Sequence, residues 1–254
     1  MEIVGIDVGG SGIKGARVDT ATGKLLTERH RIKTPKPATP AAVATTVAQV
    51  VAASDVGAAG SPGPIGVGFP VALRDGLALT ATNIDDSFVG ADVATLFSQS
   101  CGRPAFALND ADAAGLGEAH FGAARDIAGT VVLITIGTGL GSSLVVDGKL
   151  VPNTELGHLR FHESIAEAYA SDSVRKRLDL DWETWGRRFN EYLRHLDFVL
   201  HPRRIVLGGG GSKKWHKFEH LLDVDCEVVP AVLGNEAGII GAAIWAECES
   251  AQRG

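Results

Sequence analysis

Cysteine is scarce in this chain of 254 residues, and its three cysteines, Cys101, Cys226 and Cys248, lie far apart in the sequence. An odd number of cysteines without paired spacing supports neither a disulfide framework nor a structural zinc site. Cysteines of this kind are typical of reduced thiols, so we expect a protein of a reducing compartment such as the cytoplasm.

A long apolar run is also missing. No segment is long enough to span a bilayer, and Met1 leads directly into a predicted strand instead of a basic region and an apolar signal segment. We therefore expect neither export nor a membrane partner. The hydrophobic content of 45% and the charged content of 21% are those of an ordinary globular protein.

Positive charge is in the minority, since the formal net charge is −6. An extended nucleic-acid surface needs clustered positive charge to neutralise phosphates, so a nucleic-acid partner is not expected. A local anion site is still compatible with this net charge, because such a site depends on nearby groups and oriented backbone amides.

Glycine is abundant between two predicted strands near the N-terminus, Ile3–Val8 and Ile13–Val18. The turn between them contains Gly9, Gly10, Ser11 and Gly12. Because this turn carries so few side chains, its backbone N–H groups can approach an anion closely. Lys14 adds a positive charge, and Asp7 is placed to hold a divalent cation directly or through water. The pattern predicts a phosphate site with its metal, the alternative being a plain hairpin with both charges solvated.

A second stretch, Val131–Val146, repeats the order strand, glycine turn, strand. The residues in and beside its turn are Gly137, Thr138, Gly139 and Gly141. Two such hairpins predict two related lobes, each offering a phosphate-binding turn to a shared cleft. Neither hairpin is a Walker loop or a dinucleotide turn, since no Gly-Lys-Ser/Thr opens a helix and a second strand follows the glycines.

Predicted strands and helices alternate along the rest of the chain, which implies α/β lobes with mixed sheets. Further strands are expected at residues 65–69, 105–108 and 204–207. Helices are expected from residue 40 to about 57, from 91 to 100, from about 109, from 164, from 181 to 200 and from about 235 to 247. We place a smaller first lobe at 1–108 and a larger second lobe at 109–254, with the last helix, about 235–248, able to pack back on the first lobe.

Asn109, Asp110 and Asp112 crowd the start of one of these helices. Capping explains one of the first two, and the crowding makes the group a candidate for catalysis. Glu155 and His158 lie three residues apart in a polar loop, a spacing that suits either one small ligand or a surface pair.

Ser164 and Glu167 have the spacing of a capping box, which would give Glu167 a structural role at the start of its helix. The helix at 181–200 has one apolar face, which predicts packing in the core or at a subunit interface. That face contains Trp182, Trp185, Phe189, Tyr192, Leu193, Leu196 and Val199.

Four glycines, Gly208–Gly211, follow the strand at 204–207, and we expect Ser212 to cap a helix after them. Such glycines let a ligand lie against the backbone at the positive end of a helix. Basic residues flank this segment, and they form either a track for a polyanion or ordinary exposed helix charges. They are Arg203, Arg204, Lys213, Lys214, His216 and Lys217.

Taken in order and spacing, these segments resemble the ROK family of sugar kinases, which has the two-lobed actin/hexokinase-like (ribonuclease H-like) ATPase fold with mixed sheets and a central cleft. The resemblance covers nearly the whole chain. Residues 7–14 and 136–141 look like the two phosphate motifs, and 109–112 like the catalytic turn. Residues 155–158 resemble the sugar-binding motif, 167–171 the segment of a second sugar-contacting glutamate, and 207–210 the adenosine-side motif.

One departure concerns zinc. Many ROK kinases carry a cluster of three cysteines after the motif that ends in His158, whereas residues 159–166 contain none. His158 alone cannot supply the roughly four ligands that zinc needs, so no zinc is expected. This spacing, the segment Thr80–Phe88 and the run Gly-Gly-Ser-Lys-Lys-Trp resemble the family's actinobacterial polyphosphate glucokinases most closely.

The resemblance implies phosphoryl transfer to the 6-hydroxyl of glucose from polyphosphate or ATP, with Mg²⁺ near Asp7. Asp110 would be the general base, and it would bind the sugar together with Asn83, Asn109, Glu155, His158 and Glu167. The donor would lie against the two glycine turns, Lys14, and Gly209, Gly210 and Lys213. A homodimer is expected, as in relatives.

Two other functions share part of these residues. An ATP-only hexokinase or fructokinase of the family would keep all the catalytic groups. A sugar-sensing repressor would need an N-terminal helix-turn-helix, whereas this sequence begins with the phosphate hairpin, so we expect an enzyme.

Overall fold

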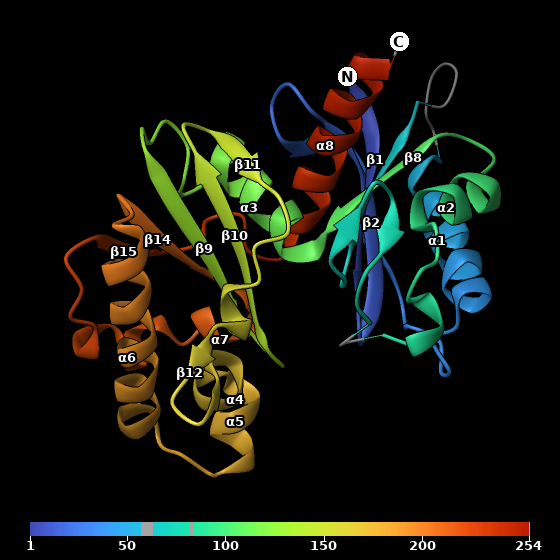
Figure 1. Ribbon diagram of the computed structural model, residues 1–254. Coiled ribbons are helices and arrows are strands. Elements are labelled where there is room, and N and C mark those ends of the chain that lie inside the picture. The colour runs from blue at the N-terminus through green and yellow to red at the C-terminus, as the bar shows by residue number, and fades with distance from the viewer. Residues whose placement is uncertain (57–62, 82–83, 254) are drawn as a thin grey trace. The chain divides into compact units, whose positions relative to one another are not determined.

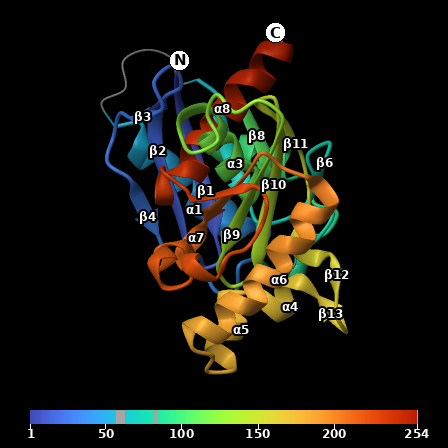
Figure 2. The same ribbon diagram turned by 90° about the vertical axis from the view of Figure 1, so that its left-hand side faces the viewer.

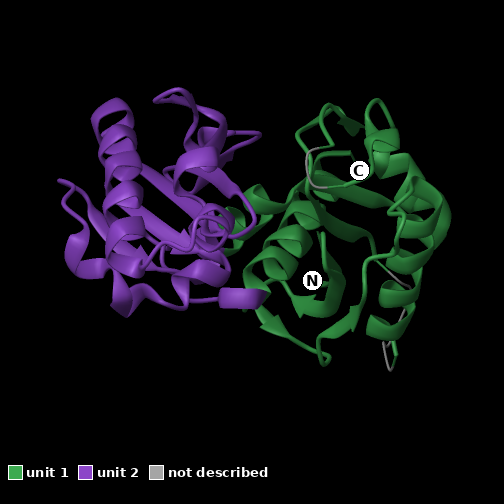
Figure 3. Cartoon of the chain, turned by 90° about the horizontal axis from the view of Figure 1, so that it is seen from below, with its two compact units in different colours: residues 1–117, 236–254 green, residues 118–235 purple. Residues whose placement is uncertain are grey.

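The computed structural model describes residues 1–56, 63–81 and 84–253 (Figure 1). The chain divides into two compact units, residues 1–117 with 236–254 and residues 118–235 (Figure 3). These units differ from the expected lobes 1–108 and 109–254. The reason is that strand β8 continues directly into helix α3, and that the last helix packs on the sheet of unit 1.

The sheet of unit 1 has the strand order β3-β2-β1-β5-β8, with β4 paired to β2. The first hairpin is antiparallel, whereas β1, β5 and β8 run parallel. Because both faces of β1 and β5 are covered, their residues are buried almost without alternation. The strands are β1 (Glu2–Gly9), β2 (Gly12–Asp19), β3 (Lys24–Leu25), β4 (His30–Ile32), β5 (Ile65–Phe69) and β8 (Ala105–Asn109).

Helices α1 and α2 cover one face of this sheet, and α8 covers the other (Figure 1). The core under α1 and α2 joins the apolar face of α1 to three phenylalanines, Phe69, Phe88 and Phe97. The remaining elements of this unit are α1 (Pro40–Ser54), β6 (Leu73–Arg74), β7 (Leu77–Ala78), η1 (Asp86–Phe88), α2 (Val93–Cys101), the start of α3 (Asp110–Phe121), η5 (Gly234–Glu236) and α8 (Ala237–Arg253). Helix α1 ends at Ser54, and Gly57, its expected end, lies outside the described residues.

Helix α8 packs against the strands at backbone distance. A Cβ atom added at Gly66 of β5 would lie 1.7 Å from the carbonyl oxygen of Ala242, and one at Gly5 of β1 would lie 1.9 Å from that of Ile239. Only glycine fits at such a close approach. Helix α8 is therefore a layer packed directly on the sheet of unit 1.

The sheet of unit 2 has the order β11-β10-β9-β14-β15. Its hairpin is antiparallel and β9, β14 and β15 run parallel, so order and directions match those of β3-β2-β1-β5-β8 in unit 1. The prediction of two related α/β lobes built on the two hairpins is confirmed by this topology. The strands are β9 (Thr130–Ile136), β10 (Leu140–Val146), β11 (Lys149–Val151), β14 (Arg204–Gly208) and β15 (Glu227–Pro230).

Helix α6 (Trp182–Leu200) forms the core of unit 2 with this sheet, as expected from its apolar face. Val199 is the exception, since it is exposed together with Phe198. Figure 2 shows α4, α5 and the β12–β13 hairpin gathered beside α6. The shorter elements are η2 (Leu156–His158), β12 (Arg160–Phe161), β13 (Ser164–Ile165), α4 (Ala166–Ala170), α5 (Asp172–Arg177), α7 (Gly209–Ser212), η3 (Trp215–Lys217) and η4 (Glu219–Leu221).

Two capping predictions are wrong. Ser164 belongs to β13, paired with Phe161, so α4 begins after Ile165 without a side-chain cap. Ser212 is the last residue of α7, and the helix that follows, η3, has Lys214 and not Ser212 at its N-cap. The Ser212 hydroxyl donates to the carbonyl of Gly209. In both cases the residue that local spacing predicts as a helix cap belongs to another element, β13 for Ser164 and α7 for Ser212.

The three cysteines are free thiols, with Cys101 and Cys226 half-buried and Cys248 exposed. In the described parts of the chain, no helix combines the length and the apolar character that crossing a membrane requires.

We expect Gly66→Ala to lower the free energy of unfolding by about 3 kcal/mol, the upper end of the usual effect of overpacking, because its Cβ would overlap the Ala242 carbonyl. Urea unfolding measures this value. Gly63→Ala is the matched control, since its Cβ would make an ordinary 3.6 Å contact with the Glu2 carbonyl. Equal stability of the two variants would contradict the close approach.

Candidate functional site

Asp7 and Lys14 face each other across the first hairpin. They are register partners on β1 and β2, and Lys14 Nζ lies 2.7 Å from Asp7 Oδ2. A Cβ at Gly238 would lie 3.4 Å from Asp7 Cγ, so the first turn of α8 passes the same carboxylate.

The turn Gly9–Gly12 is held by two side chains that we did not single out from the sequence. Arg31 Nη2 donates to the carbonyl of Ser11 at 2.9 Å, and Thr34 Oγ1 donates to that of Gly9 at 2.5 Å. Arg31 reaches the turn because β4 pairs with β2, which places Arg31 opposite Lys14. A second cation therefore stands beside the first turn, and no local motif around Arg31 reveals this.

Asp110 follows β8 at the edge where β1 and β5 also end. Gly68 of β5 is the register partner of Asp7, and a Cβ on Gly68 would lie 3.6 Å from Asp110 Cα. Asn109 is buried and caps α3, since its Oδ1 accepts from the N–H groups of Ala111 and Asp112. Capping thus accounts for Asn109, while half-buried Asp110 stands on the same sheet edge as Asp7.

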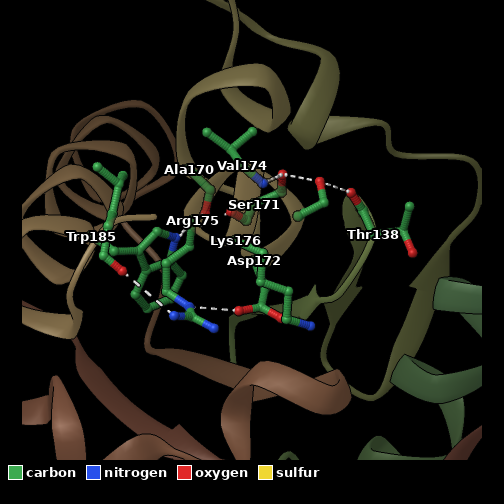
Figure 4. Close-up of polar contacts among 10 residues, drawn as sticks. Thr138, Ala170, Ser171, Asp172, Val174, Arg175, Lys176 and Trp185 are labelled. Atoms are coloured by element: carbon green, nitrogen blue, oxygen red, sulfur yellow. Dashed lines mark hydrogen bonds and ion pairs between the residues drawn. The ribbon is translucent and has the colours of Figure 1, made fainter. Parts of the chain in front are cut away.

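In unit 2, Glu167 reaches the second glycine turn. Its Oε2 accepts from the N–H of Leu140 at 2.9 Å, and a Cβ at Gly139 would lie only 2.0 Å from the same oxygen. The other side of the turn is bound by Ser173, whose N–H donates to the carbonyl of Gly137 and whose hydroxyl donates to that of Thr138. Figure 4 shows Thr138 facing the start of α5, where Ser171 and Asp172 lie. Glu167 is therefore a side chain of the turn and not a capping residue.

Glu155 and His158 lie together in the same unit, with 3.6 Å between Glu155 Oε2 and His158 Nδ1. Their loop is fixed by Ser142 of β10, which donates to the Thr154 carbonyl and accepts from the Leu156 N–H. Burial raises the pKa of Glu155, and repulsion from Glu167 adds to this while His158 opposes it. Unit 2 thus groups two carboxylates and an imidazole, the kind of set that binds a polyol.

The glycine segment after β14 lies against the end of β9, because Gly209 and Gly211 contact Ile136. A Cβ at Gly210 or Gly137 would meet no atom within 4 Å, and Lys213 is exposed. Asn83, predicted to bind the sugar, lies outside the described residues. Gly141 is on β10, one residue beyond Leu140.

Arg203 and Arg204 do not belong with the lysines of the expected track. They stand at the start of β14, and Arg204 binds the Glu227 carboxylate and the Ala123 carbonyl. Four residues of extended strand, about 13 Å, separate Arg204 from Gly208, after which the lysines follow.

Among the described residues, no group of three His, Cys, Asp or Glu side chains is arranged to hold a metal ion. A metal held by Asp7 would therefore need ligands from water or from a substrate.

The profile of the ROK family matches residues 3–169. The chain belongs to the ROK family. The "Polyphosphate glucokinase" of Mycobacterium tuberculosis (strain CDC 1551 / Oshkosh) is 44% identical over 241 residues, covering 94% of this chain and 89% of that protein. The protein of the same name from Mycobacterium leprae (strain TN) is 41% identical, covering 94% of this chain and 73% of that protein.

A solved structure shares the fold of this ROK chain. It is the inorganic polyphosphate/ATP-glucomannokinase from Arthrobacter sp. strain KM, with a TM-score of 0.93 and 46% identity, covering 98% of this chain and 99% of that one. The predicted actin/hexokinase-like class of ROK sugar kinases is confirmed.

The raised pKa of Glu155 predicts a pH-dependent stability. The folded state holds this proton more tightly than the unfolded chain, whose pKa stays near the ordinary value of 4.5, so the ionised side chain destabilises the fold above the raised pKa. This loss disappears as the pH falls to 4.5. We expect Glu155→Gln to raise Tm at neutral pH, with the gain vanishing below that pH.

Thermal unfolding followed by circular dichroism at a series of pH values measures this difference. Glu163→Gln is the control, because Glu163 is an exposed carboxylate eight residues along the chain. A gain in Tm that is the same at all pH values, or that Glu163→Gln reproduces, would contradict the assignment.

Proposed function

We propose that this ROK chain is a polyphosphate-dependent glucokinase, which transfers the terminal phosphoryl group of polyphosphate to the 6-hydroxyl of glucose to give glucose 6-phosphate. The observation that carries the proposal is the 44% identity to the Mycobacterium tuberculosis polyphosphate glucokinase over 94% of this chain. The ROK family profile, which matches residues 3–169, includes both glycine turns, Asp110, Glu155 and Glu167.

Asp110 acts as the general base in this proposal. Phosphoryl transfer depends mainly on positioning and charge neutralisation, so the base has only to take the proton of the hydroxyl as its oxygen attacks. The position of Asp110 beside Gly68, on the edge where Asp7 also lies, supports this role. Lys14 and Arg31 supply positive charge at the first turn.

Magnesium fits the residues at this edge. It binds proteins through one or two carboxylates and takes its other ligands from water and substrate phosphates, and Asp7 offers one carboxylate beside a phosphate-binding turn. Once bound, it would neutralise charge on the transferred phosphoryl group. Asp7 would hold it directly or through water.

Glu155, His158 and Glu167 bind the sugar hydroxyls, with Asn83 and Asn109 as further contacts. Several convergent donors and acceptors are needed to distinguish a polyol from water, and the grouping of the first three in unit 2 supports this assignment. The glycine turns of both units and Gly209, Gly210 and Lys213 bind the donor.

ATP is a second donor in the proposal, because the Arthrobacter enzyme is named a polyphosphate/ATP-glucomannokinase. An ATP-only hexokinase is the alternative that the same residues would serve. We further propose a cytoplasmic homodimer. The aromatic residues Trp185, Phe189 and Tyr192 of α6 are buried within unit 2, so the exposed pair Phe198 and Val199 is the part of that helix left for contact with a second copy.

The test is an assay of glucose 6-phosphate formation with polyphosphate and ATP supplied in turn. Turnover with polyphosphate supports the proposal. Turnover with ATP alone would replace it by the ATP-dependent alternative, and turnover with neither donor would reject both.

We expect Asp110→Asn to lower kcat by about 10²–10⁴-fold, the usual contribution of a general base, while the variant still binds glucose. Initial rates and calorimetric titration separate the two effects. Asp126→Asn, which removes an exposed carboxylate from a loop, should keep the wild-type kcat. A normal kcat in Asp110→Asn would show that another group takes the proton.

We expect Gly139→Ala to fold but to bind glucose about tenfold more weakly, because the new Cβ displaces Glu167 from the Leu140 N–H and a hydrogen bond to a charged group is lost. Calorimetry without donor measures the affinity. Gly137→Ala adds the same methyl group to the same turn where no atom lies within 4 Å, and it should keep the glucose affinity. Equal glucose affinities of the two variants would show that Glu167 does not contribute to glucose binding.

A further inference from the structure

Two basic runs that lie far apart in the sequence meet on one tryptophan ring in unit 2. The Cζ atom of Arg175 in α5 lies 4.2 Å from the centroid of Trp182, and Lys217 Nζ of η3 lies 5.8 Å from the same centroid. The first run, Arg175–Arg177, is not part of the track expected from the sequence. The tertiary structure thus brings Arg175, rather than Arg203 or Arg204, close to Lys217.

Both runs are anchored to the second glycine turn. Ser173, in the first turn of α5, donates to the carbonyls of Gly137 and Thr138. The other run follows α7, whose glycines pack on Ile136 at the near end of the same turn. The cations therefore extend outward from the turn that holds phosphate in the proposed function.

The charges on this surface are held in place. Asp172 is nearly buried and accepts from Arg175 Nε at 2.8 Å and from Lys176 Nζ at 2.7 Å. Trp182 lies almost parallel to Phe218, with an interplanar angle of 13°, so the ring supports the cations from a packed position. Cations that are already ordered lose less entropy when they bind a ligand.

Two other carboxylates near these runs, Asp181 and Glu183, have partners of their own. Asp181 caps α6 through the Thr184 N–H, and Glu183 lies against Arg187 and His220. Lys176 and Lys217 are exposed, as are Lys213 and Lys214. The ring of Trp182 is engaged with Arg175 and Phe218, which favours a ligand that binds by charge over a base that needs an aromatic face.

We propose that this surface, formed by Arg175, Lys176, Trp182, Lys213, Lys214 and Lys217, binds the distal phosphates of a linear polyphosphate whose reacting end lies at the second turn. The inference rests on the proposed function, since it concerns the donor of that reaction. Binding by several lysines makes affinity fall with salt, by about one unit of log–log slope for each phosphate contact.

The test uses Lys176→Gln, Lys217→Gln and the double variant, with initial rates measured on long-chain polyphosphate and on tripolyphosphate over a range of salt concentrations. We expect KM for the long chain to rise about fivefold for each lysine removed, the upper range for an exposed charge pair, so that the preference over tripolyphosphate falls by that factor. The salt slope should fall by about one for each lysine. Lys176→Arg and Lys217→Arg should restore the preference.

Lys149→Gln is the matched control, because it removes one exposed charge from the edge strand β11 of the same unit. Wild-type KM and salt slope in the double variant would overturn the inference, and so would an equal shift in Lys149→Gln, which would be an effect of net charge. A wild-type enzyme that makes no product from any polyphosphate would overturn the proposed function instead.

Discussion

The carboxylate of Glu167 occupies the space that a side chain at position 139 would need, 2.0 Å from the missing Cβ. Because Gly139 has no side chain, Glu167, which lies 27 positions beyond Leu140, can accept from the Leu140 N–H. The glycine therefore does more than let the turn bend. It also leaves room for Glu167 of α4 to reach the turn, and Ser173 of α5 binds the other side of the same turn. This one contact region therefore positions the glutamate that we propose for sugar binding and the helix that carries Arg175.

Unit 1 uses the same architecture with different side chains. Its parallel strands β1, β5 and β8 end at one edge, so Asp7, Gly68 and Asp110 lie near each other. Along the chain, Gly68 follows Asp7 by 61 positions and Asp110 follows Gly68 by 42. Helix α8 packs so closely on these strands that its first turn passes Asp7. The position of that carboxylate therefore depends on residues from both ends of the sequence.

The basic residues of unit 2 show that closeness in the sequence does not predict closeness in space. The arginines at the start of β14 and the lysines that follow its end are near each other in the sequence, yet the length of the strand separates them in space. Arg204 is also bound by Glu227. Instead, Arg175, which lies 42 positions before Lys217, shares a tryptophan ring with it. Residues at the two ends of an extended strand are close in the sequence but far apart in space. Residues that pack on the same ring are close in space whatever their separation in the sequence.

The sequence by itself determined both hairpins, the order of the strands and helices around them and the family, because a strand, a glycine turn and a second strand are specified by local residues. It also singled out Asp7, Lys14 and Asp110 as candidate site residues, because they stand directly beside such local features. Only the tertiary structure decided that Glu167 binds the second glycine turn and that Ser164 pairs in β13. It also decided that Arg31 binds the first glycine turn and that Arg175 lies on the same ring as Lys217. Spacing along one segment cannot distinguish a capping residue from one bound by another element, because the competing hydrogen-bond partner lies on a distant part of the chain.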